Sequence, residues 1–277
     1  MNKSKNIKYK SKKIDIIIYK IKIKYYYYIN QDNLIRRYNM KIAVISDIHS
    51  NIYALNEVLA DIKNKNVDMI VCTGDLVGYG TRPNEVIETL RSEKILTIMG
   101  NYDDAIGNFK IVCGCDYKDP KDSEKAALSM QFTSEITTDE NKEYLRNLPK
   151  EITFTFNNKT IRFVHGSTRL INEYLKENSK ESEEVMKELK EDILVCGHTH
   201  IPYAKYYKDK LLVNAGSVGK PKTNNPNANY VIIDIKSSVE VEILEVAYDF
   251  EKIAKEIEEN EVLPNDFARL IREGSPK

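Results

Sequence analysis

The segment from Lys41 to Met99 alternates short apolar runs with helical patterns, and this alternation limits most strongly what the chain can fold into. The apolar runs are KIAVIS (41–46), DMIVCT (68–73) and ILTIM (95–99). Between them, SNIYALNEVLADIKNK and RPNEVIETLRSEK carry apolar residues at helical spacing, the first behind a Ser/Asn cap and the second with a proline near its start. The order β-α-β-α-β predicts a mostly parallel sheet covered by helices.

The second half of the chain has a different character. A helical insert near residues 107–148 is rich in Asp, Lys and Thr, and from residue 151 onward the pattern becomes strand-rich. An α/β half followed by a β-rich half predicts an α/β fold with two sheets packed face to face and helices outside. We expect a single domain over residues 40–277 that ends in a C-terminal helical segment.

All four histidines of the chain follow predicted strands. His49 occurs in SDIHSN, His165 in RFVHGS, and His198 and His200 in CGHTH. Alternate side chains of an extended segment point the same way, so His198 and His200 should project together. One histidine in such a place is more often structural than functional. All four at strand ends favour a shared site.

Other polar side chains occupy the same kind of position. The full set at the strand ends is Asp47, His49, Asp75, Asn101, His165, His198 and His200. Loops at the carboxyl ends of strands are where open α/β sheets build sites. Two carboxylates, one amide and four imidazoles make seven oxygen and nitrogen ligands without a thiolate, too many for one tetrahedral zinc ion. The set predicts two metal ions roughly 4 Å apart, bridged by a carboxylate, which favours phosphoester hydrolysis.

The motifs DIH, GDLVGYG, GNYD, VHG, GHTH and NAGSVGKP, in this order, resemble those of the calcineurin-like metallophosphoesterases, especially their compact bacterial and archaeal phosphodiesterase-type branch. The resemblance runs from Met40 to about Ala247. It implies a four-layer α/β/β/α sandwich of two mixed sheets and hydrolysis by attack of a metal-bridging hydroxide. It also implies the ligand sets: Asp47, His49 and His200 for the first metal, Asn101, His165 and His198 for the second, and Asp75 as the bridge.

One position departs from this family, which usually has histidine where this chain has Tyr102. In the family that histidine is assigned to leaving-group protonation or charge stabilisation, supported by the following acid, here Asp103. A phenol with an ordinary pKa near 10 is a less apt proton shuttle at neutral pH. Esters with good leaving groups should be affected least. Arg169, in HGSTR, is a candidate clamp for a substrate phosphate oxygen, and an exposed surface arginine is an equal alternative.

The expected function is therefore metal-dependent hydrolysis of a small phosphoester, with diesters preferred over monoesters. Mn²⁺ is the first expectation for the two divalent ions, with Fe, Zn²⁺ and Ni²⁺ as alternatives, because mixed carboxylate and imidazole ligands do not discriminate sharply. The alternative from another class is a catalytically weak or inactive protein-binding scaffold on the same fold. Such a scaffold has no need for all seven ligands.

The first 39 residues form a low-complexity basic extension. Thirty of them are Lys, Ile, Tyr or Asn, and nine Lys and two Arg stand against two Asp. We expect this extension to be disordered or not natively translated, with Met40 as the true start. The rest of the chain carries 31 basic and 40 acidic residues, a net charge of −9 that argues against nonspecific binding to duplex DNA.

Composition also bears on the cellular location of the protein. No uncharged run of the extension approaches the roughly 20 apolar residues of a membrane span, so no membrane association is expected. The four cysteines show no disulfide-like or CxxC spacing, which fits a reducing cytoplasm.

Overall fold

A computed structural model describes residues 39–114 and 119–275 of the chain. The predicted extension, residues 1–39, lies outside the described residues except for Asn39. The helices and strands are β1 (Met40–Ile45), α2 (Ile52–Lys63), β2 (Met69–Cys72), α3 (Pro83–Ser92), β3 (Leu96–Thr97), α4 (Asn101–Gly107), α5 (Pro120–Ile136), α6 (Asp139–Arg146), β4 (Glu151–Phe156), β5 (Lys159–Val164), α7 (Lys180–Glu188), β6 (Ile193–Cys196), β7 (Tyr203–Tyr207), β8 (Lys210–Asn214), β9 (Ala228–Ile235), β10 (Val239–Val246), α8 (Phe250–Glu258) and α9 (Asp266–Glu273).

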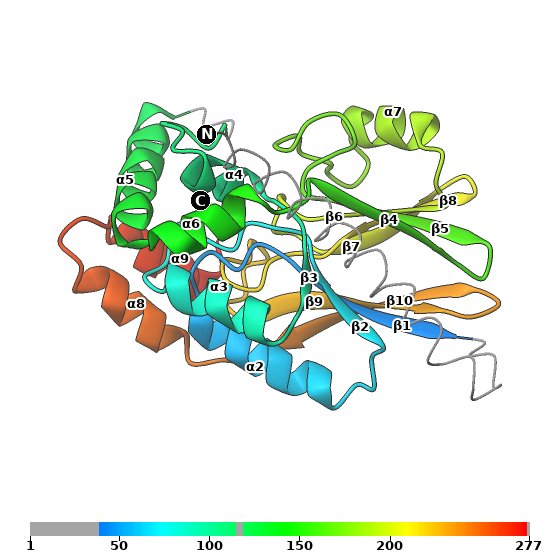
Figure 1. The fold of residues 1–277 in the computed structure, drawn as a ribbon, viewed down its shortest axis with the longest axis horizontal. Helices are drawn as coiled ribbons and strands as arrows, with labels where there is room; N and C mark the ends of the chain where they lie inside the picture. The colour runs from blue at the N-terminus through cyan, green and yellow to red at the C-terminus, as the bar shows by residue number, and fades with distance from the viewer. Residues whose placement is uncertain (1–38, 115–118, 276–277) are drawn as a thin grey trace, which may run out of the picture. The chain divides into compact units, whose positions relative to one another are not determined.

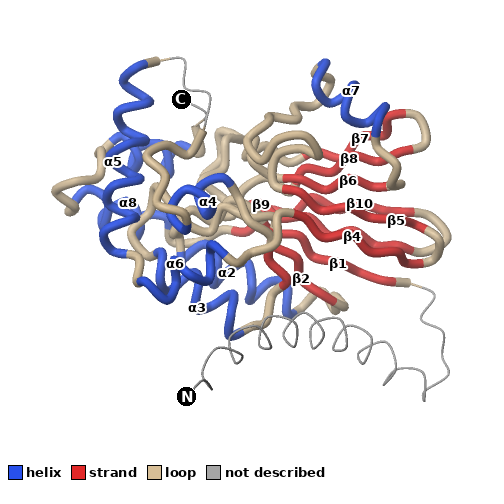
Figure 2. The backbone as a smooth tube through the Cα atoms, turned by 45° about the horizontal axis from the view of Figure 1, so that its top comes forward, coloured by secondary structure: helices blue, strands red, loops and turns tan. Residues whose placement is uncertain are grey.

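The strands form two five-stranded mixed sheets (Figures 1 and 2). The first sheet has the order β10-β9-β1-β2-β3, in which β1, β2 and β3 run parallel and β9 and β10 are antiparallel additions. The second has the order β4-β5-β6-β8-β7, with β5, β6 and β8 parallel. Both sheets therefore have a parallel centre, and the carboxyl ends of the parallel strands carry the residues singled out above.

Alternation along β1 shows how the layers are built. Ile42 and Val44 face the apolar core between the two sheets, whereas Ala43 and Ile45 face the core under the helices. Successive strand residues point to opposite faces, so a strand buried on both faces is apolar at every position. The inter-sheet core also receives Phe163 from β5.

Helices cover the outer faces of both sheets. On the first sheet, α2 buries Leu55, Val58 and Leu59 in the outer core, which it shares with α3, α8 and α9. On the second sheet, α7 packs Val185 and Met186 against Leu194 of β6. Figure 1 shows α2 and α8 on one side of the pair of sheets and α7 on the other. The predicted fold of two packed mixed sheets with outer helices is confirmed.

Local differences from the sequence patterns have physical reasons. The strand expected at 95–99 is reduced to Leu96–Thr97, because the Met99 N–H turns to the carbonyl of Pro149 (2.8 Å). Asn101 does not lie in an open loop: it begins α4, directly after the strand end. The insert region contains α5 and α6, and α6 packs against α4 and α3.

No helix of the described residues is both long and apolar enough to cross a membrane.

Candidate metal centre

Most of the predicted ligands turn out of their strands through left-handed backbone conformations. The φ angles are 51° for Asp47, 49° for His49, 55° for Asp75, 65° for His198 and 61° for His200. Each such residue costs of order 1–3 kcal/mol, and such residues cluster at functional sites. The five positive φ values therefore show that backbone strain is concentrated at this edge of the sheets, as expected of a functional site.

The first cluster consists of Asp47, His49 and His200, whose ligand atoms all lie within 4.8 Å of one another in the buried interior. The Asp47 carboxylate is held by its Oδ2 atom, which accepts hydrogen bonds from Ser46 Oγ (2.6 Å) and the His198 backbone N–H (2.9 Å). Its Oδ1 atom accepts none and faces His200 Nε2 at 3.2 Å. An orphaned buried carboxylate oxygen is costly unless a positive group faces it.

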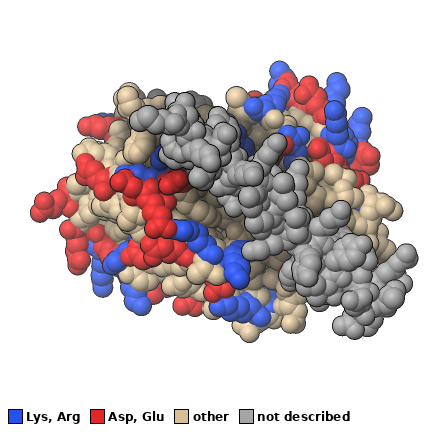
Figure 3. Space-filling model, viewed as in Figure 1, with Lys and Arg blue, Asp and Glu red and all other residues tan. Residues whose placement is uncertain are grey.

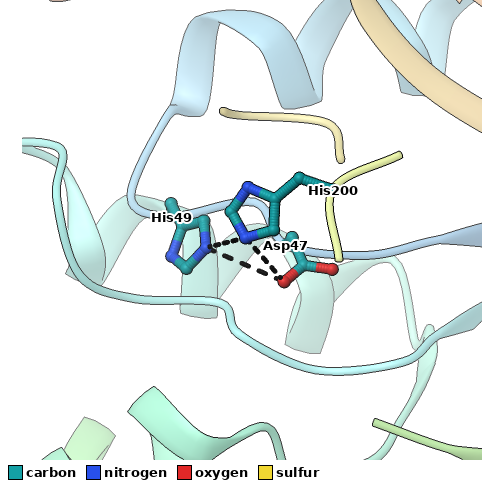
Figure 4. Close-up of side chains that lie close together, drawn as sticks. All are labelled: Asp47, His49 and His200. Carbon is teal, nitrogen blue, oxygen red and sulfur yellow. Dashed lines mark hydrogen bonds and ion pairs between the residues drawn. The ribbon is translucent and has the colours of Figure 1, made fainter. Parts of the chain in front are cut away.

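The two imidazoles of this cluster face each other through their lone pairs (Figure 4). His49 Nδ1 donates to the Val77 carbonyl (3.0 Å), and His200 Nδ1 donates to the Lys220 carbonyl (2.6 Å). Since a neutral imidazole carries one proton, both Nε2 atoms are left unprotonated, and they lie 3.2 Å apart. Two lone pairs and a carboxylate oxygen converge on one point, which is the arrangement of ligands around a cation.

The second cluster consists of Asp75, His165 and His198, again with ligand atoms within 4.8 Å. His165 Nδ1 donates to the Thr73 carbonyl (2.8 Å), and its Nε2 lies 3.0 Å from Asn101 Oδ1. His198 Nε2 donates to the Asn172 carbonyl (3.0 Å), which leaves Nδ1 as the ligand atom. In each of the four histidines, a backbone carbonyl thus holds one ring nitrogen, so that the other faces the cluster, as outer partners of metal ligands do.

Asp75 lies between the two clusters. Its Oδ2 atom is 3.5 Å from His165 Nε2 and 3.9 Å from His49 Nε2, while Oδ1 accepts the Tyr102 backbone N–H at 2.8 Å. One carboxylate oxygen therefore faces a histidine from each cluster. This is the placement required of a bridging ligand.

The ionisation of the site fits cation binding. Burial lowers the pKa of His49, of His198 and of His200 below the ordinary value, which keeps these three rings neutral. For Asp47, burial acts to raise the pKa, but the neighbouring histidines, His200 foremost, lower it well below the usual range. For His165, burial is outweighed by the Asp75 carboxylate, and its pKa rises to about 9. A site that draws a proton onto a buried histidine attracts positive charge.

Loops from the insert and from the segment after β5 orient the second cluster. The Asn101 side-chain amide donates to the Cys113 carbonyl (3.1 Å), so that Oδ1 faces His165. Asn172, which accepts from His198, donates its own side-chain amide to the Gly114 carbonyl. Residues 113–114 therefore accept hydrogen bonds both from Asn101 and from Asn172, the residue whose backbone carbonyl holds His198.

Tyr102 and Asp103 have different surroundings. The Tyr102 ring is buried, with its centroid 5.4 Å from His49 and 5.0 Å from Tyr79. The Asp103 carboxylate accepts the backbone N–H groups of Asp75 (2.8 Å), Leu76 (2.9 Å) and Gly100 (2.9 Å). Burial and then the Asp75 charge raise the pKa of Asp103 to about 7. These bonds brace the Asp75 loop, a role that sequence reasoning did not assign to Asp103.

The structure does not bring Arg169 to the two clusters. Its guanidinium pairs with the carboxylates of Glu173 and Glu184, and it is not among the described residues that line the pocket. Arg169 therefore ties the loop after β5 to α7, as expected of the surface-arginine alternative, and its role as a phosphate clamp stays a prediction. The i, i+4 spacing to Glu173 was a sequence signal for this pairing.

A pocket of about 280 Å³ opens over the clusters. It is lined by His49, Asp75, Tyr79, Tyr102, Tyr174, His198, His200 and Lys222. Sequence reasoning missed Tyr174, whose ring lies against His198 with centroids 4.1 Å apart, and Lys222. Lys222 directly follows the quoted NAGSVGKP motif, and this adjacency was the available signal.

Comparisons with known proteins assign the chain to a family. A family model of the calcineurin-like phosphoesterase superfamily domain matches residues 40–238. An uncharacterized protein of Methanocaldococcus jannaschii is 35% identical over 241 residues, covering 79% of this chain and 92% of the relative. The phosphodiesterase YfcE of Escherichia coli is 26% identical over 205 residues, covering 70% of this chain and 88% of the relative.

A solved structure supports the same assignment. The metallophosphoesterase from Sphaerobacter thermophilus superimposes with a TM-score of 0.68 at 27% identity, covering 85% of this chain and 99% of that one. Because the family model matches more than half of the chain and the fold agrees, this protein belongs to the calcineurin-like phosphoesterase superfamily.

Proposed function

We propose that this protein hydrolyses phosphodiesters with the help of two divalent metal ions. Family membership supports phosphoesterase chemistry in general, and the relative YfcE is named a phosphodiesterase. The observation that carries the metal dependence is the 3.2 Å approach of the unprotonated Nε2 atoms of His49 and His200 beside Asp47 Oδ1. A cation bound by these three residues would turn their mutual repulsion into attraction.

The residues divide between the two ions. Asp47, His49 and His200 would hold the first, Asn101, His165 and His198 would hold the second, and Asp75 would contact both. When bound, the ions supply Lewis-acid charge and an activated water for an in-line displacement at phosphorus. The chain orients its four histidine rings through the backbone carbonyls of Val77, Lys220, Thr73 and Asn172.

Tyr102 occupies the position at which the family resemblance implies a residue that acts on the leaving group. It lines the pocket, and a phenol both donates and accepts hydrogen bonds. We assign it a hydrogen bond to the leaving oxygen, which serves good leaving groups better than poor ones. Asp103 acts on the site indirectly, by fixing the backbone at Asp75 and Gly100.

The types of ligand favour particular metal ions, and the surface charge favours a particular class of substrate. Hard oxygen donors combined with imidazoles and no thiolate suit Mn²⁺, with Fe, Zn²⁺ and Ni²⁺ able to replace it. On the face shown in Figure 3, acidic side chains gather over the helix-rich end at the left, and both signs are mixed on α7, which favours a small substrate over nucleic acid.

The test is hydrolysis of a chromogenic diester and its monoester by the full chain, stripped of metal and then resupplied with Mn²⁺. The proposal predicts turnover only with Mn²⁺ and faster cleavage of the diester. Folded protein that binds no metal and cleaves neither ester would favour the scaffold alternative. Metal-dependent cleavage of the monoester alone would retain the hydrolase and reject the diester preference.

A further inference from the structure

The loop that follows β8 is fixed against both sides of the first cluster. Ser217 Oγ and the Gly219 N–H both donate to the Asp47 carbonyl, at 2.7 Å and 3.1 Å. The Lys220 carbonyl accepts from His200 Nδ1 at 2.6 Å, and the Lys222 N–H donates to the His200 carbonyl at 3.2 Å. The position of this loop is therefore set by the same residues that form the cluster.

The loop carries two lysines in different environments. The Lys220 side chain is 7% exposed, and its Nζ lies 4.7 Å from the centre of the Tyr79 ring, where the ammonium packs against the aromatic face. Lys222 is only half-buried and lines the pocket over the clusters. Among the described residues that line this pocket, Lys222 is the one lysine or arginine.

Lys222 shares its pocket with histidines of both clusters, because His198 and His200 line the same pocket. His200 belongs to the first cluster and His198 to the second. A phosphoryl group in this pocket, facing both clusters, therefore comes within range of the ammonium.

We propose that Lys222 is a substrate-binding residue whose ammonium group binds an anionic oxygen of the phosphoryl group. The proposal rests on the proposed function and adds to it a basic side chain that lines the pocket. Arg169 is not among the described residues that line it. An ammonium offers three donors and a full charge to a phosphate oxygen. Because a monoester carries up to two negative charges and a diester carries one, Lys222 should favour the monoester more than the diester.

The experiment compares the full chain with Lys222→Gln, Lys222→Arg and the exposed-lysine control Lys187→Gln on α7, all loaded with Mn²⁺. We expect Lys222→Gln to lower kcat/KM about 10- to 100-fold and to weaken competitive inhibition by inorganic phosphate by a similar factor, with bound Mn²⁺ unchanged. The loss should be larger for the chromogenic monoester than for the diester. Lys222→Arg should retain most of the activity, and Lys187→Gln should match the unsubstituted chain.

Two results would overturn the proposal. One is unchanged kcat/KM and phosphate inhibition in Lys222→Gln with both ions bound. The other is a loss that follows a fall in bound Mn²⁺, because Lys222 would then support the metal clusters instead of the substrate. If the unsubstituted chain with Mn²⁺ turned over neither ester, the proposed function would fail by itself. Calorimetric binding of inorganic phosphate to the two Mn²⁺-loaded proteins would still decide the role of Lys222, since equal affinities would reject it.

Discussion

His49 Nε2 and His200 Nε2 lie 3.2 Å apart, and neither carries a proton, because each ring donates its Nδ1–H to a backbone carbonyl. In a protein without a cation-binding role this contact would be relieved, since rotating one ring or exchanging one carbonyl partner removes the repulsion. Here both rings are fixed from behind, and Asp47 Oδ1 faces the same point. Asp47, His49 and His200 all have positive φ angles, so the fold accepts backbone strain in order to keep these three side chains close together.

Asp75→Asn should reduce turnover more than about 100-fold. The Oδ2 atom of Asp75 faces His49 and His165, one from each cluster, so loss of its charge weakens both metal sites together. Metal analysis of the purified variant should show fewer than two ions per chain. Asp139→Asn, which alters a fully exposed carboxylate, is the matched control and should behave like the unsubstituted chain. Retention of two ions and full turnover in Asp75→Asn would contradict the bridging role.

Tyr102→His should raise activity on esters with poor leaving groups and change it little on esters with good ones. An imidazole titrates near neutral pH and transfers a proton more readily than a phenol does. The measurement is kcat/KM across a series of aryl phosphodiesters of rising leaving-group pKa. The dependence on leaving-group pKa should become shallower in the variant. No gain would mean that Tyr102 or another group already serves, and an equal gain on every ester would mean that the substitution does not act through the leaving group.

Gly197→Ala should weaken the first cluster selectively. A Cβ at this position would lie 1.9 Å from Ser46 Oγ and 2.6 Å from Asp47 Oδ2, so Asp47 must move. We expect metal affinity at this cluster to fall roughly 10- to 100-fold, with turnover following. Ser46→Ala separates the causes, because it removes the hydrogen bond to Asp47 without intruding on it. If Ser46→Ala lost as much metal as Gly197→Ala, displacement by the added methyl group would not be the cause.

Glu256→Gln should destabilise the fold in a pH-dependent way. Glu256 on α8 accepts hydrogen bonds from Tyr53 (2.5 Å), Thr81 and Arg82, and so joins α8 to α2 and the start of α3. Burial acts to raise its pKa, but the bonds from Arg82, Thr81 and Tyr53 outweigh burial and lower it. The stabilisation is therefore complete above the unfolded pKa of about 4.3 and is lost as the pH falls through the lower folded value.

Urea unfolding at two pH values checks this expectation. At pH 7 the variant should be about 1–3 kcal/mol less stable than the unsubstituted chain. At pH 3 the difference should shrink, because protonated Glu256 resembles glutamine. A difference that stayed constant with pH would show that the carboxylate charge contributes nothing.

Much of the fold was predictable because it depends on local periodicity. The runs in β1, β2 and β6 are apolar at nearly every position, as expected of strands covered on both faces, and α2 carries its apolar residues at helical spacing. The short β3 was not predictable in length, because it ends where Met99 meets Pro149, fifty residues further along the chain. The start of α4 at Asn101 was not predicted, because the GNYD segment was interpreted as a site motif at a strand end and not as the first turn of a helix.

The candidate site was also predictable only in part. The seven predicted ligands could be found because each follows a strand and the carboxyl ends of parallel strands lie at one edge of a sheet. Their roles as ligands stay a prediction. The surroundings of Asp103, Arg169 and Lys222 depend largely on distant contacts, which local sequence signals indicate only in part. Asp103 meets the backbone at Asp75, Arg169 meets Glu184 on α7, and Lys222 reaches the pocket through a loop anchored on Asp47 and His200.

The most direct test of the central claim is a titration of the metal-stripped full chain with Mn²⁺, following bound metal and diester hydrolysis in the same samples. Two clusters that share Asp75 predict that hydrolysis rises with bound metal and reaches its plateau at two ions per chain. A plateau of hydrolysis at one bound ion, or full hydrolysis without Mn²⁺, would contradict a two-metal phosphoesterase.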